Sequence, residues 1–202
     1  MENKLQWQKI LLDALNTSDK SSQQVINDVI AQVGEVLNAD VAALYVKDKQ
    51  GDLDCQYIWS KNQSMSAEEY VTEWQRANMK FRSWQNGQGS GKLVDKGYLV
   101  IDAKHMDEAA KKIMSGGPVK SFTAVPVYVN GNYGAVFVLA NTSINKLWTT
   151  EEIEFVKQTG DVLRSALEKI ESDDSVKRIN SVLLDTYNYI DAVSYTHLTL
   201  PT

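Results

Sequence analysis

The segment between residues 121 and 139 restricts the fold more strongly than any other part of this chain. Two runs rich in β-branched and aromatic residues, SFTAVPVYV and YGAVFVL, flank the turn sequence Asn130-Gly131-Asn132. A tight hairpin turn needs residues that tolerate positive φ, and Asn-Gly is the strongest signal of this kind. Pro126 has no amide hydrogen, so we expect it at a strand edge or beside a bulge. The segment therefore predicts an antiparallel hairpin.

The rest of the chain supplies further strands and helices around this hairpin. Apolar residues at helical spacing predict a helix over residues 3–16 and a second helix that starts at Ser21 or Ser22, both good N-cap residues. Helices segregated around a mostly antiparallel sheet make an α+β domain. The remaining predicted elements are strands at 41–47, 53–59 and 98–101, a helix at 67–77, a short strand at 81–84 and a helix at 107–114.

A long helix is expected to close the domain. It runs over residues 150–170, and Thr149 with Glu152 forms the sequence pattern of a capping box. The polar run at residues 171–174 is expected to interrupt it. A further helical stretch follows, whose apolar spacing of three and four residues fits a parallel two-stranded helix pair. A solvated linker packed on its own domain is the alternative. The apolar residues of this stretch are Val176, Ile179, Leu183 and Tyr187.

Composition and charge exclude several classes of function. The chain has 202 residues, one cysteine, a formal net charge of −5 and a pI near 5.1. A single cysteine excludes an internal disulfide and any multi-cysteine metal site. The acidic balance argues against nucleic acid and anionic membranes as partners, and no apolar run has the roughly 18–20 residues of a membrane span. We expect a cytoplasmic protein.

The last residues differ in character from the rest. The run VSYTHLTLPT at the end of the chain resembles the translation of an adapter used in preparing sequencing libraries. We therefore expect residues 192–202 to be non-native, with a native C-terminal strand as the alternative, and leave His197 out of the site analysis. His105 is then the one remaining histidine, and the native gene is expected to continue past residue 191.

Three segments resemble parts of a GAF domain. The run VINDVIAQVGEVLNADVAALYVKDKQGDL is similar to the opening helix and hairpin of that fold, and YLVIDAKHM is similar to the strand and loop before its small internal helix. The run SFTAVPVYVNGNYGAVFVLANTSINKLWTTEEIEFVKQTGDVLRSALEKI resembles its last hairpin and closing helix. The resemblance implies a central antiparallel sheet with helices packed on one face and a ligand-pocket region on the other.

The resemblance also implies a domain organisation and a role. It predicts an N-terminal helix at residues 1–20, a GAF domain at 21–171, and a signalling helix or linker at 172–191, where SVLLDTYNYIDA resembles the start of a PAS domain. GAF domains are typically sensory modules, so we expect a regulatory, non-enzymatic fragment that forms a homodimer through its C-terminal helix. The expected output domain is a histidine kinase or a cyclic-di-GMP enzyme. The alternatives are a ligand-free dimerisation scaffold and the sensor domain of a transcription regulator.

The pocket residues are assigned from the resemblance alone. Aromatic residues fall in or near the segments that wall the GAF pocket, and an aromatic-lined cavity suits a flat or hydrophobic small ligand. The alternative is that these rings fill the cavity and nothing binds. Alternation along the first strand places Leu44 and Val46 opposite Tyr45, against the helices. The resemblance assigns to the pocket Tyr45, Tyr57, Trp59, Trp74, Trp84, Asp102, His105 and Thr123.

Other motifs give weak support for specific chemistry, and we expect no cofactor, no metal and no catalytic residue. The run GQGSGK at 87–92 fails the P-loop pattern at both ends, so a loop is favoured. The Asn-Lys pair of cyclic-nucleotide-binding GAF domains is replaced by Asn141-Thr142, and Lys146 lies four residues late. Cys55 is expected to be a small core residue, and His105 a loop or pocket residue rather than a metal ligand.

Overall fold

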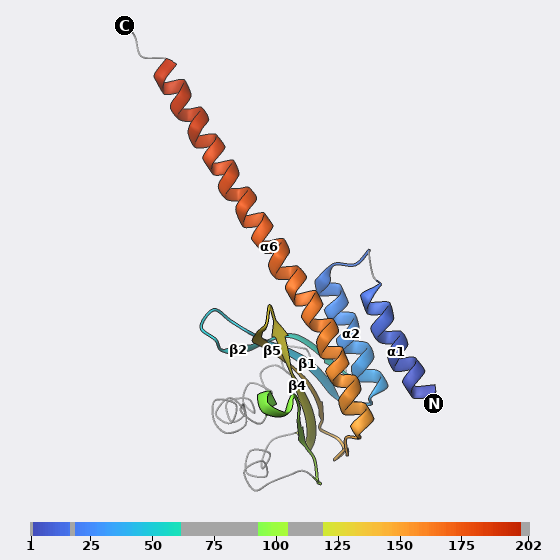
Figure 1. The fold of residues 1–202 in the computed structure, drawn as a ribbon. Helices are drawn as coiled ribbons and strands as arrows, with labels where there is room; N and C mark the ends of the chain where they lie inside the picture. Colours follow the sequence, from blue (N-terminus) through green and yellow to red (C-terminus); the bar gives the residue numbers. More distant parts are fainter. Residues whose placement is uncertain (1, 17–18, 62–92, 105–118, 199–202) are drawn as a thin grey trace.

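The computed structural model describes residues 2–16, 19–61, 93–104 and 119–198, with side chains described between residues 4 and 183. The predicted helices at 67–77 and 107–114 and the predicted strand at 81–84 lie outside these residues. The elements occur in the order α1 (Glu2–Leu15), α2 (Ser22–Val36), β1 (Val41–Lys47), β2 (Leu53–Ser60), β3 (Leu99–Ile101), β4 (Ser121–Val129), β5 (Asn132–Asn141) and α6 (Thr150–Leu198). This is the predicted α+β fold (Figure 1).

The five strands form one sheet in the order β2-β1-β5-β4-β3, and every neighbouring pair is antiparallel. The predicted hairpin is β4–β5, with Val129 paired to Asn132. Asn130 and Gly131 have φ of 49° and 78°, which is why Asn-Gly is favoured there. β3 pairs only with residues 122–124 of β4, so Pro126 lies beyond this pairing, where its missing amide hydrogen is tolerated.

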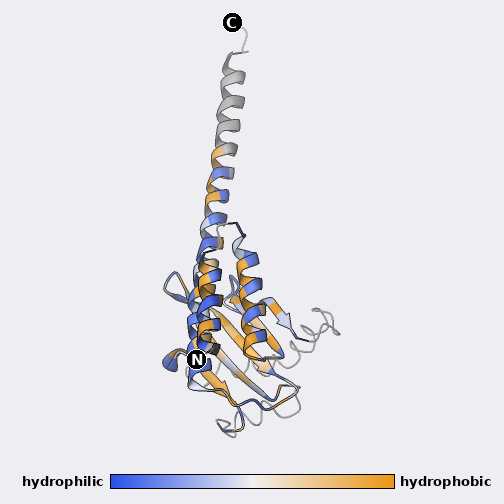
Figure 2. Cartoon of the chain, turned by 90° about the vertical axis from the view of Figure 1, so that its right-hand side faces the viewer, coloured by the Kyte–Doolittle hydropathy of each residue, from blue (hydrophilic) through white to orange (hydrophobic). Residues whose placement is uncertain are grey.

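α2 and α6 pack on one face of the sheet, and α1 packs against these two helices (Figure 1). α2 begins with a capping box, in which Ser21 Oγ accepts from the Gln24 amide at 3.3 Å and Gln24 Oε1 accepts from the Ser21 amide at 2.9 Å. α1 is the outermost helix in the view, and its Trp7 stacks on Phe155 of α6 with ring centroids 4.9 Å apart. Hydrophobic residues of the strands and helices meet between these layers (Figure 2) and form the larger core cluster.

α6 differs from the prediction because it continues through the polar run at 171–174 as one helix of 49 residues. The expected interruption is therefore wrong. Serine and aspartate cost at most about 0.7 kcal/mol each inside a helix, and an established helix propagates cooperatively. Local contacts also support the helix, since Ser175 Oγ donates to the Glu171 carbonyl at 2.8 Å and Lys177 lies 3.8 Å from Asp174.

Candidate functional site: the face of the sheet opposite the helices

The sheet face opposite the helices carries a second, smaller apolar cluster around Tyr45. Tyr45 is 5% exposed, and Leu44 on the same strand belongs to the cluster under the helices. The predicted alternation along β1 is therefore confirmed. We call this surface the Tyr45 face, and its buried members are Val41, Ala43, Tyr45, Leu93, Leu99, Ile101, Phe122, Ala124, Val136, Val138 and Ala140.

Tyr57 and Trp59 lie on the other face of the sheet. They pack against the helix-side cluster, so they do not share a face with Tyr45, and their assignment to a ligand pocket stays a prediction. The reason is the register, which pairs Tyr57 with Leu44 and shifts at the next position of β1, where Tyr45 pairs with Cys55. Paired residues of antiparallel strands point to the same face. Because of this shift, Cys55 is the residue of β2 that lies opposite Tyr45.

Thr123 and Asp102 also lie away from the Tyr45 face. Strand alternation puts Thr123 on the side of Val125, under the helices, and its hydroxyl donates to the Leu99 carbonyl at 3.2 Å. Asp102 follows β3, is fully buried, and accepts from the Lys104 amide at 2.9 Å. Both side chains thus make hydrogen bonds at β3 or directly after it, and their assignment to a ligand pocket stays a prediction. The other three predicted pocket residues, Trp74, Trp84 and His105, lie outside the described residues.

Cys55, the pairing partner of Tyr45 on β2, carries a reactive thiol on this face. Burial raises the pKa of its thiol to about 11, the Asp54 carboxylate also raises it, and a hydrogen bond with the Tyr45 side chain opposes this shift. The nucleophile and metal ligand is the thiolate, which this environment disfavours. Among the described residues, no group of three or more His, Cys, Asp or Glu side chains could hold a metal ion. The described part of this face is suited to apolar contact rather than to nucleophilic chemistry.

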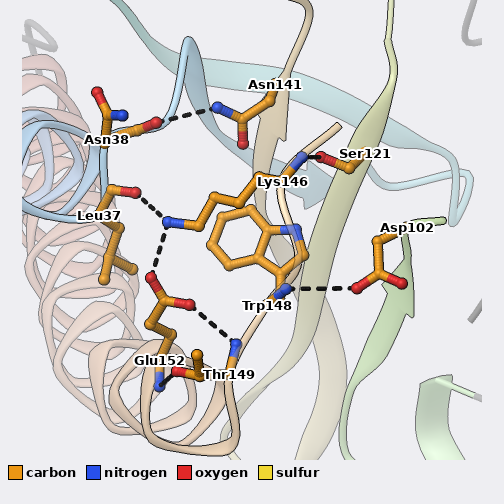
Figure 3. A network of polar contacts seen from close by, with 9 residues as sticks. All are labelled: Leu37, Asn38, Asp102, Ser121, Asn141, Lys146, Trp148, Thr149 and Glu152. Atoms are coloured by element: carbon orange, nitrogen blue, oxygen red, sulfur yellow. Dashed lines mark hydrogen bonds and ion pairs between the residues drawn. The ribbon is translucent and has the colours of Figure 1, made fainter. Parts of the chain in front are cut away.

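Lys146 lies at the centre of a polar network beside the start of α6 (Figure 3). Its ammonium donates to the Leu37 carbonyl at the end of α2 and forms an ion pair with Glu152 Oε1 at 2.7 Å. The two side chains are 13% and 16% exposed. The Lys146 Nζ also lies 4.6 Å from the centre of the Trp148 ring. Lys146 therefore joins α2 to the first turn of α6.

Other members of the network anchor the loop before α6 to the sheet (Figure 3). The Lys146 amide donates to Ser121 Oγ at 3.0 Å, and the Trp148 amide donates to Asp102 Oδ2 at 3.3 Å. The predicted capping box is confirmed, because the Thr149 amide donates to Glu152 Oε2 at 2.9 Å and the Glu152 amide donates to Thr149 Oγ1 at 3.2 Å. The loop before α6 is thus hydrogen-bonded both to β4 and to the residue that follows β3.

Asp40 ties the same loop to the start of β1. Its Oδ2 accepts from the Ser143 amide and hydroxyl at 2.8 and 2.7 Å, and from the Thr142 amide at 2.8 Å. Burial acts to raise the pKa of Asp40, but the hydrogen bonds from Ser143 and Thr142 outweigh it and lower the pKa below 3.8. No local sequence pattern points to Asp40 as a site residue. Lys146 stands out in the sequence only as a displaced motif residue, although a lysine six positions before a first-turn acid is also compatible with an ion pair.

Comparisons with known proteins agree with this architecture. The family model for the GAF domain matches residues 21–167. The fold resembles a phycocyanobilin-bound GAF domain from a cyanobacterial phytochrome, at 14% identity and a TM-score of 0.62 over 84% of this chain and 95% of that one. It also resembles the GAF domain of an Acinetobacter phosphoenolpyruvate-protein phosphotransferase, at 14% identity and a TM-score of 0.57 over 83% of this chain and 93% of that one.

A third similar structure is the GAF domain of a phosphoenolpyruvate-protein phosphotransferase from Coxiella burnetii, at 15% identity and a TM-score of 0.58 over 85% of this chain and 98% of that one. Curated proteins supply no match. None of the helices in the described residues is long and apolar enough to cross a membrane. The family model covers well over half of the 202 residues and the sheet has the arrangement that the resemblance implied, so the chain belongs to the GAF domain family.

Proposed function

We propose that this GAF domain is a sensory module that binds a small, flat or apolar ligand at the Tyr45 face and signals through α6. One observation carries this proposal: α6 is a continuous helix from the Lys146 network to an exposed apolar stripe beyond the domain. A single stiff element therefore connects the sheet to the segment where a second copy would pair. The output domain proposed beyond residue 191 is of the histidine kinase or cyclic-di-GMP class, reached through a PAS domain.

The mechanism would be a shift between two states. A ligand that prefers one arrangement of β3 and β4 changes the population of the corresponding arrangement of the loop before α6. Asp102 on the β3 side and Ser121 on β4 both bond to that loop, so the change reaches α6 through hydrogen bonds already in place. The apolar character of the Tyr45 face supports a ligand with a flat apolar body.

Pairing of two copies through α6 is supported by the stripe that the helix exposes after leaving the domain (Figure 2). Its members, Val176, Ile179, Val182 and Leu183, are 52–65% exposed. In proteins most of the stability of a helix comes from packing of its apolar face, and Val176, Ile179 and Leu183 follow the three-and-four spacing of a coiled-coil seam. We therefore propose a parallel homodimer.

The dimer is tested by the mass in solution of the chain and two variants, measured by sedimentation equilibrium over a range of concentrations. Ile179→Asp places a charge on the α6 stripe and is expected to give a monomer. Ser181→Asp adds the same charge about 200° around the helix, on the opposite face, and is expected to stay dimeric. A wild-type monomer at all concentrations, or equal dimerisation of both variants, would refute pairing through this stripe.

Ligand binding is tested by thermal unfolding of the chain with cyclic AMP, cyclic GMP and phycocyanobilin as probes. A ligand that binds only the folded state stabilises it by about 2.7 kcal/mol at one hundred times its Kd. The variant Tyr45→Leu should lose this stabilisation, while Tyr57→Leu on the opposite face should keep it. A ligand that stabilises the wild type and both variants equally would contradict binding at the Tyr45 face.

The second candidate is a ligand-free dimerisation scaffold. It is favoured by the burial of the Tyr45 face, where Tyr45 is 5% exposed and its neighbours are buried. A dimer that no small molecule stabilises would support this candidate over the sensory one.

A further inference from the structure

α6 has one part that packs on its own domain and one part that extends beyond it (Figure 1). Ile170 is the last described residue of the helix that packs against the core, and every side chain from residue 171 to residue 183 is exposed. The β4–β5 turn marks the boundary, because the Asn130 amide donates to Glu168 Oε1 at 2.9 Å and its side chain donates to Glu171 at 2.7 Å. The part of α6 before residue 172 is therefore attached to the domain.

One face of α6 carries a seven-residue pattern through both parts of the helix. Seven residues turn a helix by about 700°, close to two full turns, so residues one heptad apart lie on nearly the same face. Ile179 lies about 160° around the helix from the buried Leu163, so this face points away from the core. We call it the α6 seam. Its members, all exposed, are Ser165 (d), Lys169 (a), Ser172 (d), Val176 (a), Ile179 (d) and Leu183 (a).

The part of the α6 seam beside the domain is unsuited to pairing with a second copy. In a parallel pair the a positions of the two helices meet, so Lys169 would face its counterpart with the same charge. The d positions hold Ser165 and Ser172, which offer little apolar surface. Glu168 and Asp173 occupy the flanking g and e positions, where they would bring two carboxylates together. Both the centre and the flanks of this part therefore oppose pairing.

The part of the α6 seam beyond the domain has the opposite character. Val176, Ile179 and Leu183 are 52–60% exposed, so their burial against a second copy would remove apolar surface from water. The flanking g and e positions are Ser175 and Asn180, which carry no charge. The change from polar to apolar members thus falls within one heptad of the last residue that packs on the core.

We propose that the two α6 helices of a homodimer join from Val176 onward and stay apart between Ser165 and Ser172, so that the pair forms a fork. This inference rests on the homodimer of the proposed function and states which part of α6 is its interface. The separated arms of the fork are the segments that the Asn130 turn attaches to each domain. A sensory domain would then act on the length of the joined segment, since closing the arms adds one heptad to the pair.

Disulfide formation between introduced cysteines tests the fork. Every chain carries Cys55→Ser, which removes the one native cysteine, and sedimentation equilibrium sets a concentration at which it is dimeric. Ile179→Cys and Ser172→Cys place a thiol at two d positions one heptad apart, and Ser181→Cys at an f position gives the rate of random collision. Under copper–phenanthroline and dissolved oxygen, Ile179→Cys should form the disulfide between chains at least tenfold faster than Ser172→Cys.

The two ways in which this test can fail are distinguishable. Equal rates for Ser172→Cys and Ile179→Cys, both above that of Ser181→Cys, would mean a seam closed along its length and would overturn the fork alone. A rate for Ile179→Cys no higher than that of Ser181→Cys would refute the homodimer as well. Circular dichroism and the midpoint of thermal unfolding verify that each variant is folded.

A second pair of variants tests what keeps the arms apart. In the Ser172→Cys chain, Lys169→Leu replaces the charge at the a position by an apolar side chain and should raise the rate of disulfide formation at least tenfold. Lys177→Leu removes the same charge at a b position, where the side chain is 79% exposed, and should leave the rate unchanged. Equal rates in these two variants would contradict the role of the polar seam. The readout needs no ligand, so it is independent of binding at the Tyr45 face.

Discussion

Replacement of Lys146 by methionine tests whether the polar network stabilises the domain. The substitution keeps most of the apolar stem but removes the ammonium that bonds to the Leu37 carbonyl and pairs with Glu152 at 2.7 Å. Loss of one partner from a buried ion pair costs about 3–5 kcal/mol, and the loss of a cation–π contact costs about 0.5–1 kcal/mol. The side chains of the pair are 13% and 16% exposed, so we expect a total of about 3 kcal/mol.

This loss is large enough to measure by thermal unfolding. For a chain of this size, 1 kcal/mol corresponds to about 2–4 °C in Tm, so Lys146→Met should lower the Tm by about 6–12 °C. Lys157→Met is the matched control, because Lys157 pairs with Glu154 at 3.4 Å on the exposed side of the same helix. An exposed pair of this kind contributes about 0.2–1 kcal/mol.

A double-mutant cycle separates the ion pair from the other contacts. Glu152→Gln keeps the capping-box geometry, since glutamine also serves at this helix position. The coupling between Lys146→Met and Glu152→Gln is expected to exceed 1 kcal/mol, within the usual range for residues in one network. A fall in Tm no larger than that of Lys157→Met, or additive effects in the cycle, would refute the view that this pair connects α2 and α6.

The geometry of single residues also has measurable consequences. Cys55 should react with iodoacetamide at pH 8 roughly one hundredfold more slowly than after unfolding in urea, because its pKa is raised from 9.0 to about 11; equal rates would contradict the burial of the thiol. Gly34→Ala should destabilise the domain by about 1–3 kcal/mol, since an added Cβ would lie 2.4 Å from the Trp59 ring. Gly160→Ala should be neutral or stabilising by up to about 1 kcal/mol in urea unfolding, because its added Cβ meets side chains at 3.5 Å or more. A larger loss of stability in Gly160→Ala than in Gly34→Ala would be inconsistent with this packing. Asn130→Ala should destabilise the chain by about 1 kcal/mol more than Asn130→Gly, because φ is 49° there; equal midpoints would argue against this turn geometry.

Apart from the continuity of α6, the described elements agree with local sequence patterns because those patterns act over a few residues. The Asn-Gly turn requires positive φ at adjacent positions, and this requirement alone places the β4–β5 hairpin. The capping boxes at Ser21 and Thr149 likewise begin their helices through contacts three residues apart. The GAF family was also recognisable from the sequence, since its end segments retain this pattern of helix, hairpin and closing helix.

The tertiary structure decided which side chains share a face and which distant groups meet. The register of β1 with β2 shifts between Leu44 and Tyr45, which leaves one extra residue in β2. Cys55 therefore lies on the Tyr45 face, whereas Tyr57, two residues later, lies under the helices. Such a bulge depends on how two strands pack and has no reliable local signal here. Lys146 reaches Leu37 across 109 positions, and the continuity of α6 reflects cooperative helix propagation rather than the preference of a few polar residues. Local chemistry thus determined the elements, while long-range packing determined the site, because contacts between distant segments form only once the chain has folded.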